Sequence, residues 1–175
     1  VVVSLLGLVA APAVAALEDG LIGYYKMDET GGDIAPDASG MGNDGQLSDG
    51  LTWIPGYDGL ALAFSGETTP HVEISAAELS AEAGSVSVWG RLYDPQPTHT
   101  RYFFGHTTQP SYNNRIQMYI DGGTDLDIGL GGAHALDTDI VSLPTEAWLH
   151  VVLTWDNGQY AVYLDGEEIS SGTYT

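Results

Sequence analysis

Short apolar runs alternate with turn-forming residues along almost the whole chain after Gly20. The runs are rich in Val, Ile, Tyr, Trp and Leu, and clusters of Gly, Asn, Asp and Pro separate them, which is typical of strands joined by turns. Only residues 75–84 could form a helical turn. The expected strands are 21–27, 60–64, 71–75, 85–92, 101–106, 115–120, 126–130, 148–156 and 159–166. Many short strands without intervening helices predict an all-β, antiparallel sandwich or barrel.

Alternation within a strand predicts which side chains face the core. In residues 85–92, Val86 and Val88 lie on one face, whereas Trp89 and Arg91 lie on the other. A tryptophan on the outer face of a strand needs either a second packed layer or a ligand.

The C-terminal third predicts a meander of three strands. Residues 148–156 are apolar on both faces, which indicates a central strand. Asn157-Gly158 is a strong hairpin signal, because both central positions of a type I′ turn need positive φ, and Asp165-Gly166 repeats the device. The strands of the meander are 148–156, 159–164 and 167–170.

The charge of the chain excludes some partners. The 175 residues include 24 acidic and 4 basic side chains, a net charge of −20. Such a surface repels nucleic acid and anionic membranes, so neither is an expected partner. Solubility in a salty medium and affinity for divalent cations are alternative explanations of the charge. Without cysteine the chain has no disulfide, no thiolate metal site and no cysteine nucleophile.

The N-terminal segment suggests export. Residues 1–16 are apolar and contain Ala13-Val14-Ala15, the A-x-A pattern of a signal-peptide cleavage site. We expect a signal peptide or hydrophobic N-terminal segment here, with a longer pilin-like anchor as the alternative. The mature domain is then expected to begin near Leu17, to be secreted or held at the cell surface, and not to insert into a membrane.

Several segments together resemble a known family. The stretches "LIGYYKMDETGGDIAPDASGMGNDGQL", "SVSVWGRL" and "EAWLHVVLTWDNGQYAVYLDGEEISSG" are similar to the laminin-G-like branch of the concanavalin A-like lectin/glucanase superfamily. The resemblance implies one domain over residues 17–175, folded as a two-sheet jelly-roll sandwich and continuing past Thr175. Residues 65–70 depart from the family, which usually has an Asp-rich turn at this place.

Two segments are candidate calcium sites. In "DASGMGNDGQL", Asp37, Asn43 and Asp44 are hard oxygen donors of the kind that calcium prefers. The alternative is a turn, in which Gly supplies left-handed backbone and Asp and Asn make local hydrogen bonds. Asn113 and Asn114 form the second candidate, because their placement resembles the acid-amide pair with which pentraxin-type members hold calcium.

Known catalytic patterns are missing from the sequence. The glucanase branch uses E-x-D-x-x-E on one strand, because the alternating face aims the carboxylates at one sugar bond. The nearest patterns, "DLD" at 125–127 and "DTD" at 137–139, have no third partner in register. The histidines show no metal-ligand spacing, and His150 is expected to pack within a strand. The sequence thus favours a non-catalytic domain.

Aromatic residues near predicted loops are the candidate glycan ligands. They are Trp53, Tyr57, Tyr93, Tyr102 and Tyr112. An aromatic ring can cover the apolar face of a sugar ring while polar neighbours bind its hydroxyl groups. We therefore expect a secreted or cell-surface carbohydrate-binding or adhesion module, with a polysaccharide or glycan as partner and other domains of a larger protein as further partners. The alternatives are part of a glycoside hydrolase or polysaccharide lyase, and a structural module of a surface or pilin-like assembly.

Overall fold

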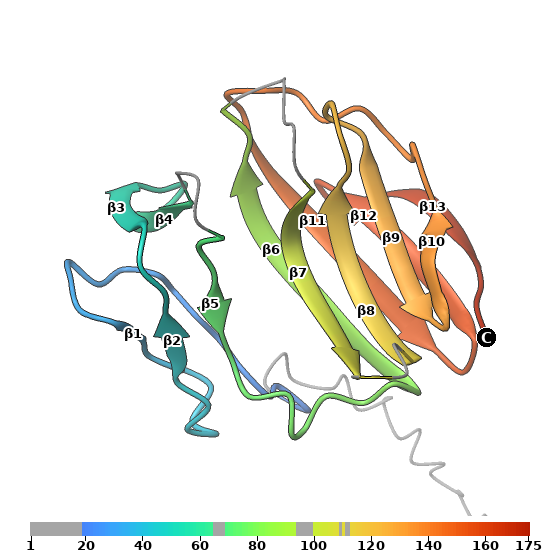
Figure 1. Cartoon of the computed structure of the whole chain (residues 1–175), viewed down its shortest axis with the longest axis horizontal. Coiled ribbons are helices and arrows are strands. Elements are labelled where there is room, and N and C mark those ends of the chain that lie inside the picture. Colours follow the sequence, from blue (N-terminus) through green and yellow to red (C-terminus); the bar gives the residue numbers. More distant parts are fainter. Residues whose placement is uncertain (1–18, 65–68, 94–99, 109, 111–112) are drawn as a thin grey trace, which may run out of the picture. The chain divides into compact units, whose positions relative to one another are not determined.

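The computed structural model describes residues 19–64, 69–93, 100–108, 110 and 113–175 (Figure 1). The described residues form strands and no helix. The chain divides into two compact units, which are described separately. The first unit comprises residues 1–54 and 60–75, and the second comprises residues 55–59 and 76–175.

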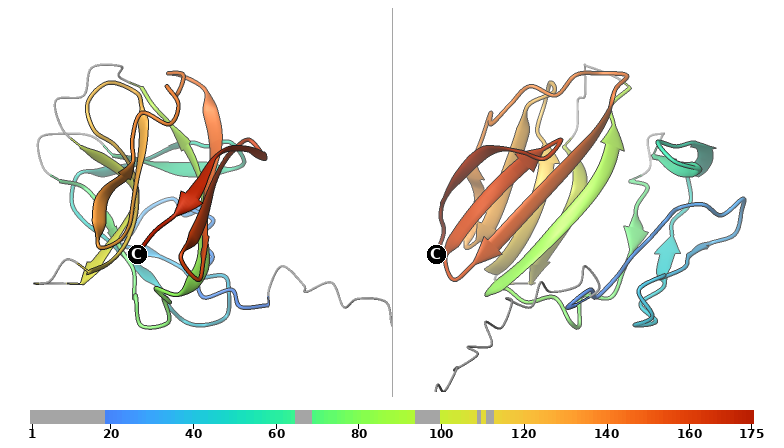
Figure 2. Two further views of the ribbon diagram at one scale, coloured as in Figure 1. Left: turned by 90° about the vertical axis from the view of Figure 1, so that its right-hand side faces the viewer. Right: turned by 180° about the vertical axis from the view of Figure 1, so that it is seen from behind.

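The second unit is a sandwich of two four-stranded antiparallel sheets (Figures 1 and 2). One sheet has the strand order β13-β12-β11-β6, and the other has the order β10-β9-β8-β7. The first sheet consists of β6 (Ala83–Arg91), β11 (Trp148–Asp156), β12 (Gln159–Leu164) and β13 (Glu167–Thr173). The second consists of β7 (Arg101–Thr108), β8 (Asn113–Ile120), β9 (Leu126–Gly131) and β10 (Ala133–Asp137). The predicted all-β antiparallel sandwich is confirmed.

Both sheets contribute alternate apolar side chains to a single core. The fully buried members include Met118 of β8, Ile128 of β9 and Leu153 of β11. Each such side chain contributes about 1.5–3 kcal/mol of transfer free energy. The strand β11 pairs with β12 on one side and with β6 on the other, as expected for a central strand. Its inward residues are buried, whereas its outward residues are half-buried.

The two predicted hairpins of the meander are confirmed. Asn157 and Gly158 have φ values of 45° and 83°, and the strands that they join pair from Asp156 and Gln159 onward. Asp165 and Gly166 have φ values of 50° and 87°. Positive φ at both central positions matches the right-handed twist of the flanking strands. Local turn chemistry thus sets the register of β11, β12 and β13.

An irregular stretch joins β9 to the edge strand β10. Ala133 pairs with Leu130 and Asp137 pairs with Ile128, so three residues of β10 lie opposite Gly129 alone. A Cβ atom at position 129 would lie 2.3 Å from the carbonyl oxygen of His134, a distance at which the backbone must shift. The bulge therefore requires glycine at position 129, because the backbone of β10 approaches that residue too closely for a side chain.

The first unit contains only short strands. A three-stranded sheet has the order β1-β2-β5, and β3 and β4 form a two-stranded sheet. Their bounds are β1 (Ile34–Ala35), β2 (Gly45–Leu47), β3 (Leu51–Pro55), β4 (Leu60–Phe64) and β5 (Val72–Glu73). Sequence periodicity could not detect strands of two or three residues, because they are too short to show an alternation.

One local prediction was wrong. Residues 21–27 were expected to form a strand, but they make only an isolated bridge between Tyr25 and Asp37. Met27 has a φ of 58°, which interrupts the extended run. Residues 75–84, where a helical turn could form, contain a single hydrogen-bonded turn from the N–H of Leu79 to the carbonyl oxygen of Ala76, at 3.1 Å, and no helix. The predicted boundary near Leu17 lies outside the described residues and stays a prediction.

Candidate functional site

The outer face of β6 and β11 carries a group of aromatic and basic side chains. Trp89 of β6 pairs directly with His150 of β11, and Arg91 pairs directly with Trp148. Side chains two residues apart on a strand point to the same face, so these four residues form a continuous surface. Tyr57 and Tyr93 extend it through ring contacts with Trp89 and Arg91. We call this surface the aromatic patch; its residues are Tyr57, Trp89, Arg91, Tyr93, Trp148 and His150.

Trp89 takes part in two ring stacks. Its ring centroid lies 3.9 Å from that of Tyr57, with 13° between the planes, and 5.0 Å from that of His150, with 16° between the planes. Trp89 is 44% exposed and Tyr57 is 63% exposed. The stacks orient the rings while leaving part of each residue exposed to solvent.

Two hydrogen bonds hold His150 in place beneath the stack. Its Nε2 atom lies 2.7 Å from the hydroxyl oxygen of Ser87, and its backbone N–H donates to Asp165 Oδ1 at 2.9 Å. Ser87 and His150 therefore add polar groups at the edge of the aromatic surface. The expectation that His150 packs within a strand is consistent with this half-buried position.

Arg91 supplies the positive charge of the aromatic patch. Its guanidinium carbon lies 4.4 Å from the ring centroid of Tyr93 and 5.2 Å from that of Trp148. One guanidinium N–H donates to the hydroxyl of Tyr93. The Nε atom is buried and has no hydrogen-bond partner among the described residues. The patch thus joins a cation to exposed aromatic rings.

The structure brings together two of the five predicted glycan ligands. Tyr57 and Tyr93 belong to the aromatic patch. Tyr102 lies on β7, in the opposite sheet, with its ring centroid 5.4 Å from that of Tyr119. Trp53 lies on β3, in the first unit. Tyr112 is outside the described residues, so its prediction is not tested.

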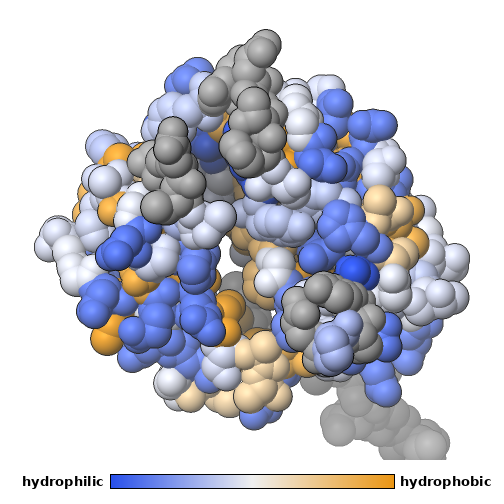
Figure 3. Space-filling view, viewed as in Figure 1, coloured by the Kyte–Doolittle hydropathy of each residue, from blue (hydrophilic) through white to orange (hydrophobic). Residues whose placement is uncertain are grey.

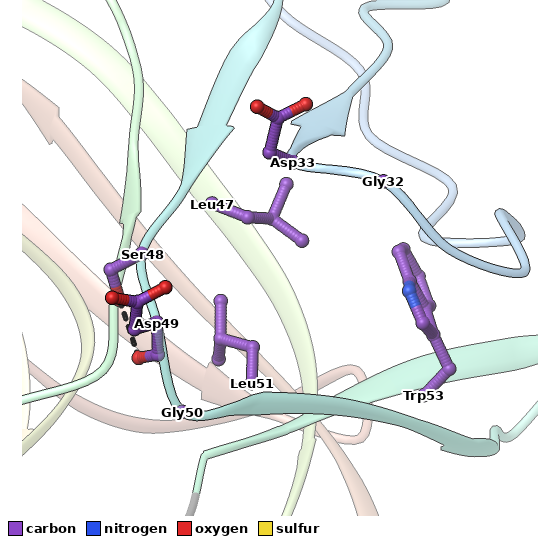
Figure 4. Close-up of a pocket in the computed structure, with 8 residues that line it drawn as sticks. All are labelled: Gly32, Asp33, Leu47, Ser48, Asp49, Gly50, Leu51 and Trp53. Carbon is purple, nitrogen blue, oxygen red and sulfur yellow. Dashed lines mark hydrogen bonds between the residues drawn. The ribbon is translucent and has the colours of Figure 1, made fainter.

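Trp53 lines a pocket of about 210 Å³ within the first unit (Figure 4). Leu47 and Leu51 lie between Trp53 and Asp49, and the carboxylate of Asp33 points away from the two leucines (Figure 4). The carboxylates do not converge with the indole on one point.

A second polar and aromatic cluster lies on the outer face of the sheet that contains β8 and β9. Tyr119 of β8 is 1% exposed, and its hydroxyl donates to the carbonyl oxygen of His134 at 3.1 Å. Burial, with the nearby charge of Asp127, raises the pKa of Tyr119 to about 12. Burial also raises the pKa of Asp127, which accepts the N–H of Asp139 at 2.8 Å. These groups are covered and satisfied by one another, which is typical of a structural network.

Asp37 organises the turn formed by residues 37–47. Its Oδ1 accepts the backbone N–H groups of Tyr24, at 2.9 Å, and Ser39, at 2.8 Å. Its Oδ2 accepts the hydroxyl of Ser39, at 2.7 Å, and the N–H of Asn43, at 3.0 Å. The hydroxyl of Ser39 and these N–H groups hold the pKa of Asp37 well below its usual range. Both carboxylate oxygens already face protein donors.

The side chains of the other two candidate residues of this segment also take part in hydrogen bonds. The side-chain N–H of Asn43 donates to the carbonyl oxygen of Ile22 at 2.8 Å, and Asp44 Oδ1 accepts the N–H of Asp37 at 2.8 Å. A calcium ion at Asp37 would have to displace the N–H and O–H donors that point at its carboxylate oxygens. These bonds are those of a hydrogen-bonded turn.

The second calcium candidate lies at the start of β8. Asn113 pairs with Thr108, and Asn114 has a φ of 53°. Within the described ranges, no three His, Cys, Asp or Glu side chains are arranged to hold a metal ion. The structure does not test calcium binding, which stays a prediction for both segments.

The four aspartates at 125, 127, 137 and 139 are part of hydrogen-bonded networks. Asp125 accepts the hydroxyl of Ser142, and Asp137 Oδ2 accepts the hydroxyls of Tyr160, at 3.0 Å, and Ser170. Asp127 is 7% exposed. The bonds of Asp137 connect β10 to β12 and β13 of the opposite sheet, and those of Asp125 and Asp127 hold the segment after β10. A structural role accounts for these three carboxylates.

The face drawn in Figure 3 is mainly hydrophilic, with apolar residues in scattered positions. This surface agrees with the acidic composition of the chain. Among the described residues, no helix has the length and apolarity needed to cross a membrane.

The chain belongs to the concanavalin A-like lectin/glucanases superfamily. The Laminin_G_3 model of that superfamily matches residues 65–175, which is more than half of the sequence. The match covers most of the second unit, including β6, β11 and every residue of the aromatic patch except Tyr57. No curated protein matches the chain.

Solved structures with a similar fold include parts of carbohydrate-active enzymes. Domain 4 of AbnA, an extracellular GH43 arabinanase from Geobacillus stearothermophilus solved with arabinotriose, has 26% identity and a TM-score of 0.62 over 79% of this chain and 69% of that domain's chain. A mutant sialidase from Trypanosoma rangeli has 18% identity and a TM-score of 0.70 over 93% of this chain and 26% of its own. An S-layer domain-containing protein from Clostridium thermocellum has 16% identity and a TM-score of 0.56, over 86% and 71% of the two chains. The last two comparisons show the fold alone.

The sequence did not assign four members of the aromatic patch as ligands. Alternation had placed Trp89 and Arg91 on an outward face, which was the available signal. The pairing that sets Trp148 and His150 beside them depends on the register of β6 with β11. That register is a long-range property, since the two strands are far apart in sequence.

Proposed function

We propose that this protein is a non-catalytic glycan-binding module that acts outside the cell or at its surface. The aromatic patch is its binding surface. The superfamily includes lectins and glucanases, and fold alone does not decide between them. The choice therefore depends on the chemistry of the described residues.

One observation carries the proposal, namely the convergence of exposed rings around hydrogen-bonding groups on one strand pair. Trp89 and Tyr57 are partly exposed aromatic residues. Beside them lie two polar atoms, the hydroxyl oxygen of Ser87 and Nε2 of His150, which are 2.7 Å apart. Sugar rings have apolar C–H faces and hydroxyl groups at their edges, so this combination is complementary to them.

The comparison with AbnA supports the same function. That domain was solved with arabinotriose, and the enzyme is described as extracellular. Its 26% identity and the shared fold make a neutral arabino-oligosaccharide the first ligand to test. The aspartates near the sandwich edge are engaged in structural hydrogen bonds, which supports a non-catalytic role.

The test is calorimetric titration of the 175-residue chain with arabinotriose and with longer arabino-oligosaccharides. We expect saturable binding that Trp89→Ala weakens at least about tenfold, because truncating a central aromatic anchor commonly costs 2 kcal/mol or more. No sugar should be released or shortened during the titration, as product analysis by chromatography would verify.

Tyr102→Ala is the matched control. Tyr102 is 49% exposed and lies on the opposite sheet, so its removal deletes a ring of similar exposure away from the patch. Binding that survives Trp89→Ala and disappears with Tyr102→Ala would move the site to the β7–β10 sheet. If a broad glycan panel showed no binding at all, the proposed function would be wrong, and a structural role in a surface assembly would replace it.

A further inference from the structure

We propose that the aromatic patch is selective for acidic glycans and that Arg91 pairs with a uronate carboxylate. This inference deepens the proposed function and depends on it. It concerns which sugars the patch prefers, and it is carried by the surroundings of a single guanidinium group.

The rings beside Arg91 leave the edge of its guanidinium group as the polar surface. Tyr93 and Trp148 lie within 5.2 Å of the guanidinium carbon, as cation–π partners do. Ring contacts satisfy the faces of a guanidinium plane but not its N–H groups, which project from the edge. A planar carboxylate can accept two of these parallel N–H groups at once.

Among the described residues, one acceptor lies within hydrogen-bonding distance of this group. One N–H donates to the hydroxyl of Tyr93, and the buried Nε has no partner in that part of the chain. No carboxylate of the described residues forms a salt bridge with Arg91. The carboxylate of Asp165 accepts the backbone N–H of His150. Within the described residues, the charge of Arg91 is therefore not neutralised by an ion pair.

The composition of the chain makes this cation unusual. Arg91 is one of only 4 basic residues beside 24 acidic ones. At physiological ionic strength, charges further apart than about 8 Å are largely screened. The net charge of −20 therefore weakens the approach of an anionic glycan without cancelling a direct contact with Arg91.

The position of Arg91 relative to the ring stack suits a uronic acid. Trp89 and Arg91 are two residues apart on the same face of β6, which separates their Cα atoms by about 7 Å. A hexuronate ring placed on the Trp89 and Tyr57 stack would carry its carboxylate at the ring edge, within reach of a long arginine side chain.

The experiment compares an anionic ligand with its uncharged methyl ester. Oligogalacturonate and its methyl-esterified form are titrated into the full chain at physiological ionic strength by calorimetry. We expect the acid form to bind about tenfold or more tightly, because a charge-assisted hydrogen bond exceeds a neutral one by that order. Arg91→Gln should remove this preference, so that the acid and the ester bind with equal affinity.

Arg101→Gln is the matched control, since it removes the same charge from β7 in the opposite sheet. It should retain the preference for the acid form. Circular dichroism of each variant would establish that it is folded. The third ligand is an oligosaccharide without uronic acid that carries sulfate esters. If it bound more tightly than oligogalacturonate, the assignment of a carboxylate as the partner of Arg91 would be overturned.

The outcomes separate this inference from the proposed function. Equal binding of acid and ester by the natural chain, or a preference that persists in Arg91→Gln, would overturn the role of Arg91 while glycan binding stands. Loss of all binding to neutral and acidic sugars alike would instead remove the proposed function.

Discussion

Trp89 of β6 and His150 of β11 lie directly opposite each other, with ring centroids 5.0 Å apart and planes 16° apart. The two residues are far apart in sequence, and antiparallel pairing of their strands brings the rings together. The ring of Tyr57 also stacks on that of Trp89, with ring centroids 3.9 Å apart. The stack is therefore both a part of the sandwich and a part of its exposed surface.

The first prediction concerns the energy of this pair. Trp89→Ala should lower the free energy of unfolding by about 1–2 kcal/mol, because it removes two ring stacks from a partly exposed position. In a double-mutant cycle with His150→Ala, the coupling energy should be about 0.5–1.5 kcal/mol. Urea denaturation of the four proteins measures both quantities. A coupling energy near zero would mean that the rings are adjacent without stabilising each other.

The second prediction tests the close approach of the β10 backbone to Gly129 of β9. Gly129→Ala should destabilise the protein by about 1–3 kcal/mol, because its methyl group would meet the carbonyl oxygen of His134 at 2.3 Å. Gly132→Ala is the control, since the nearest atom to its added carbon is 3.9 Å away. Thermal unfolding should show a clear loss for the first substitution and little change for the second. Equal effects would contradict the bulge at His134.

The strands that sequence predicted best are those whose alternation is long and whose turns are explicit. Residues 148–156 form β11 with the expected bounds, and the turns at Asn157-Gly158 and Asp165-Gly166 have the expected positive φ values. The strand expected at 21–27 failed for a local reason. The carboxylate of Asp37 takes the N–H of Tyr24, and Met27 turns to positive φ, so side-chain hydrogen bonding replaced a strand ladder.

The candidate site was harder to predict than the fold. Sequence reasoning selected aromatic residues near loops and so found Tyr57 and Tyr93, but it also selected Tyr102, which lies on the other sheet. Whether two aromatic side chains share a face depends on strand order and register, which the chain sets through distant pairings. The outward position of Trp89 was predictable from alternation, whereas its partner His150 was not.

The third prediction concerns pH and the buried carboxyl group of Asp127. Burial raises its pKa in the folded state, so folding favours the protonated form. Such a group stabilises the fold fully below its unfolded pKa of about 3.9, and this contribution is lost as the pH rises through the folded pKa. Once ionised, the buried carboxylate is therefore a cost to stability.

Asp127→Asn should consequently raise the unfolding midpoint at neutral pH. The amide oxygen can still accept the N–H of Asp139, so the hydrogen bond at 2.8 Å would be kept while the charge is removed. Below about pH 4 the two proteins should become equally stable, because both side chains are then neutral. Thermal melts across a pH series measure the difference. A lower midpoint for the variant at neutral pH would show that the ionised carboxylate is stabilising.

The fourth prediction separates a hydrogen-bonded turn from a calcium site at Asp37. Four protein donors point at its two carboxylate oxygens. We therefore expect the unfolding midpoint to be the same in calcium as in magnesium at equal ionic strength. Asp37→Asn should lower the midpoint with or without calcium, because an amide keeps only one acceptor oxygen. Ser39→Ala should lower it less, since it removes a single donor.

A calcium effect would have a distinct signature. A ligand that binds only the folded protein adds about 2.7 kcal/mol of stability at one hundred times its dissociation constant, which thermal unfolding would detect. If calcium raised the midpoint and Asp37→Asn abolished that rise, the donors around Asp37 would have to rearrange on binding, and the turn would be a metal site after all. If the rise persisted in Asp37→Asn and disappeared in an Asn113→Ala, Asn114→Ala variant, calcium would bind at the start of β8 instead.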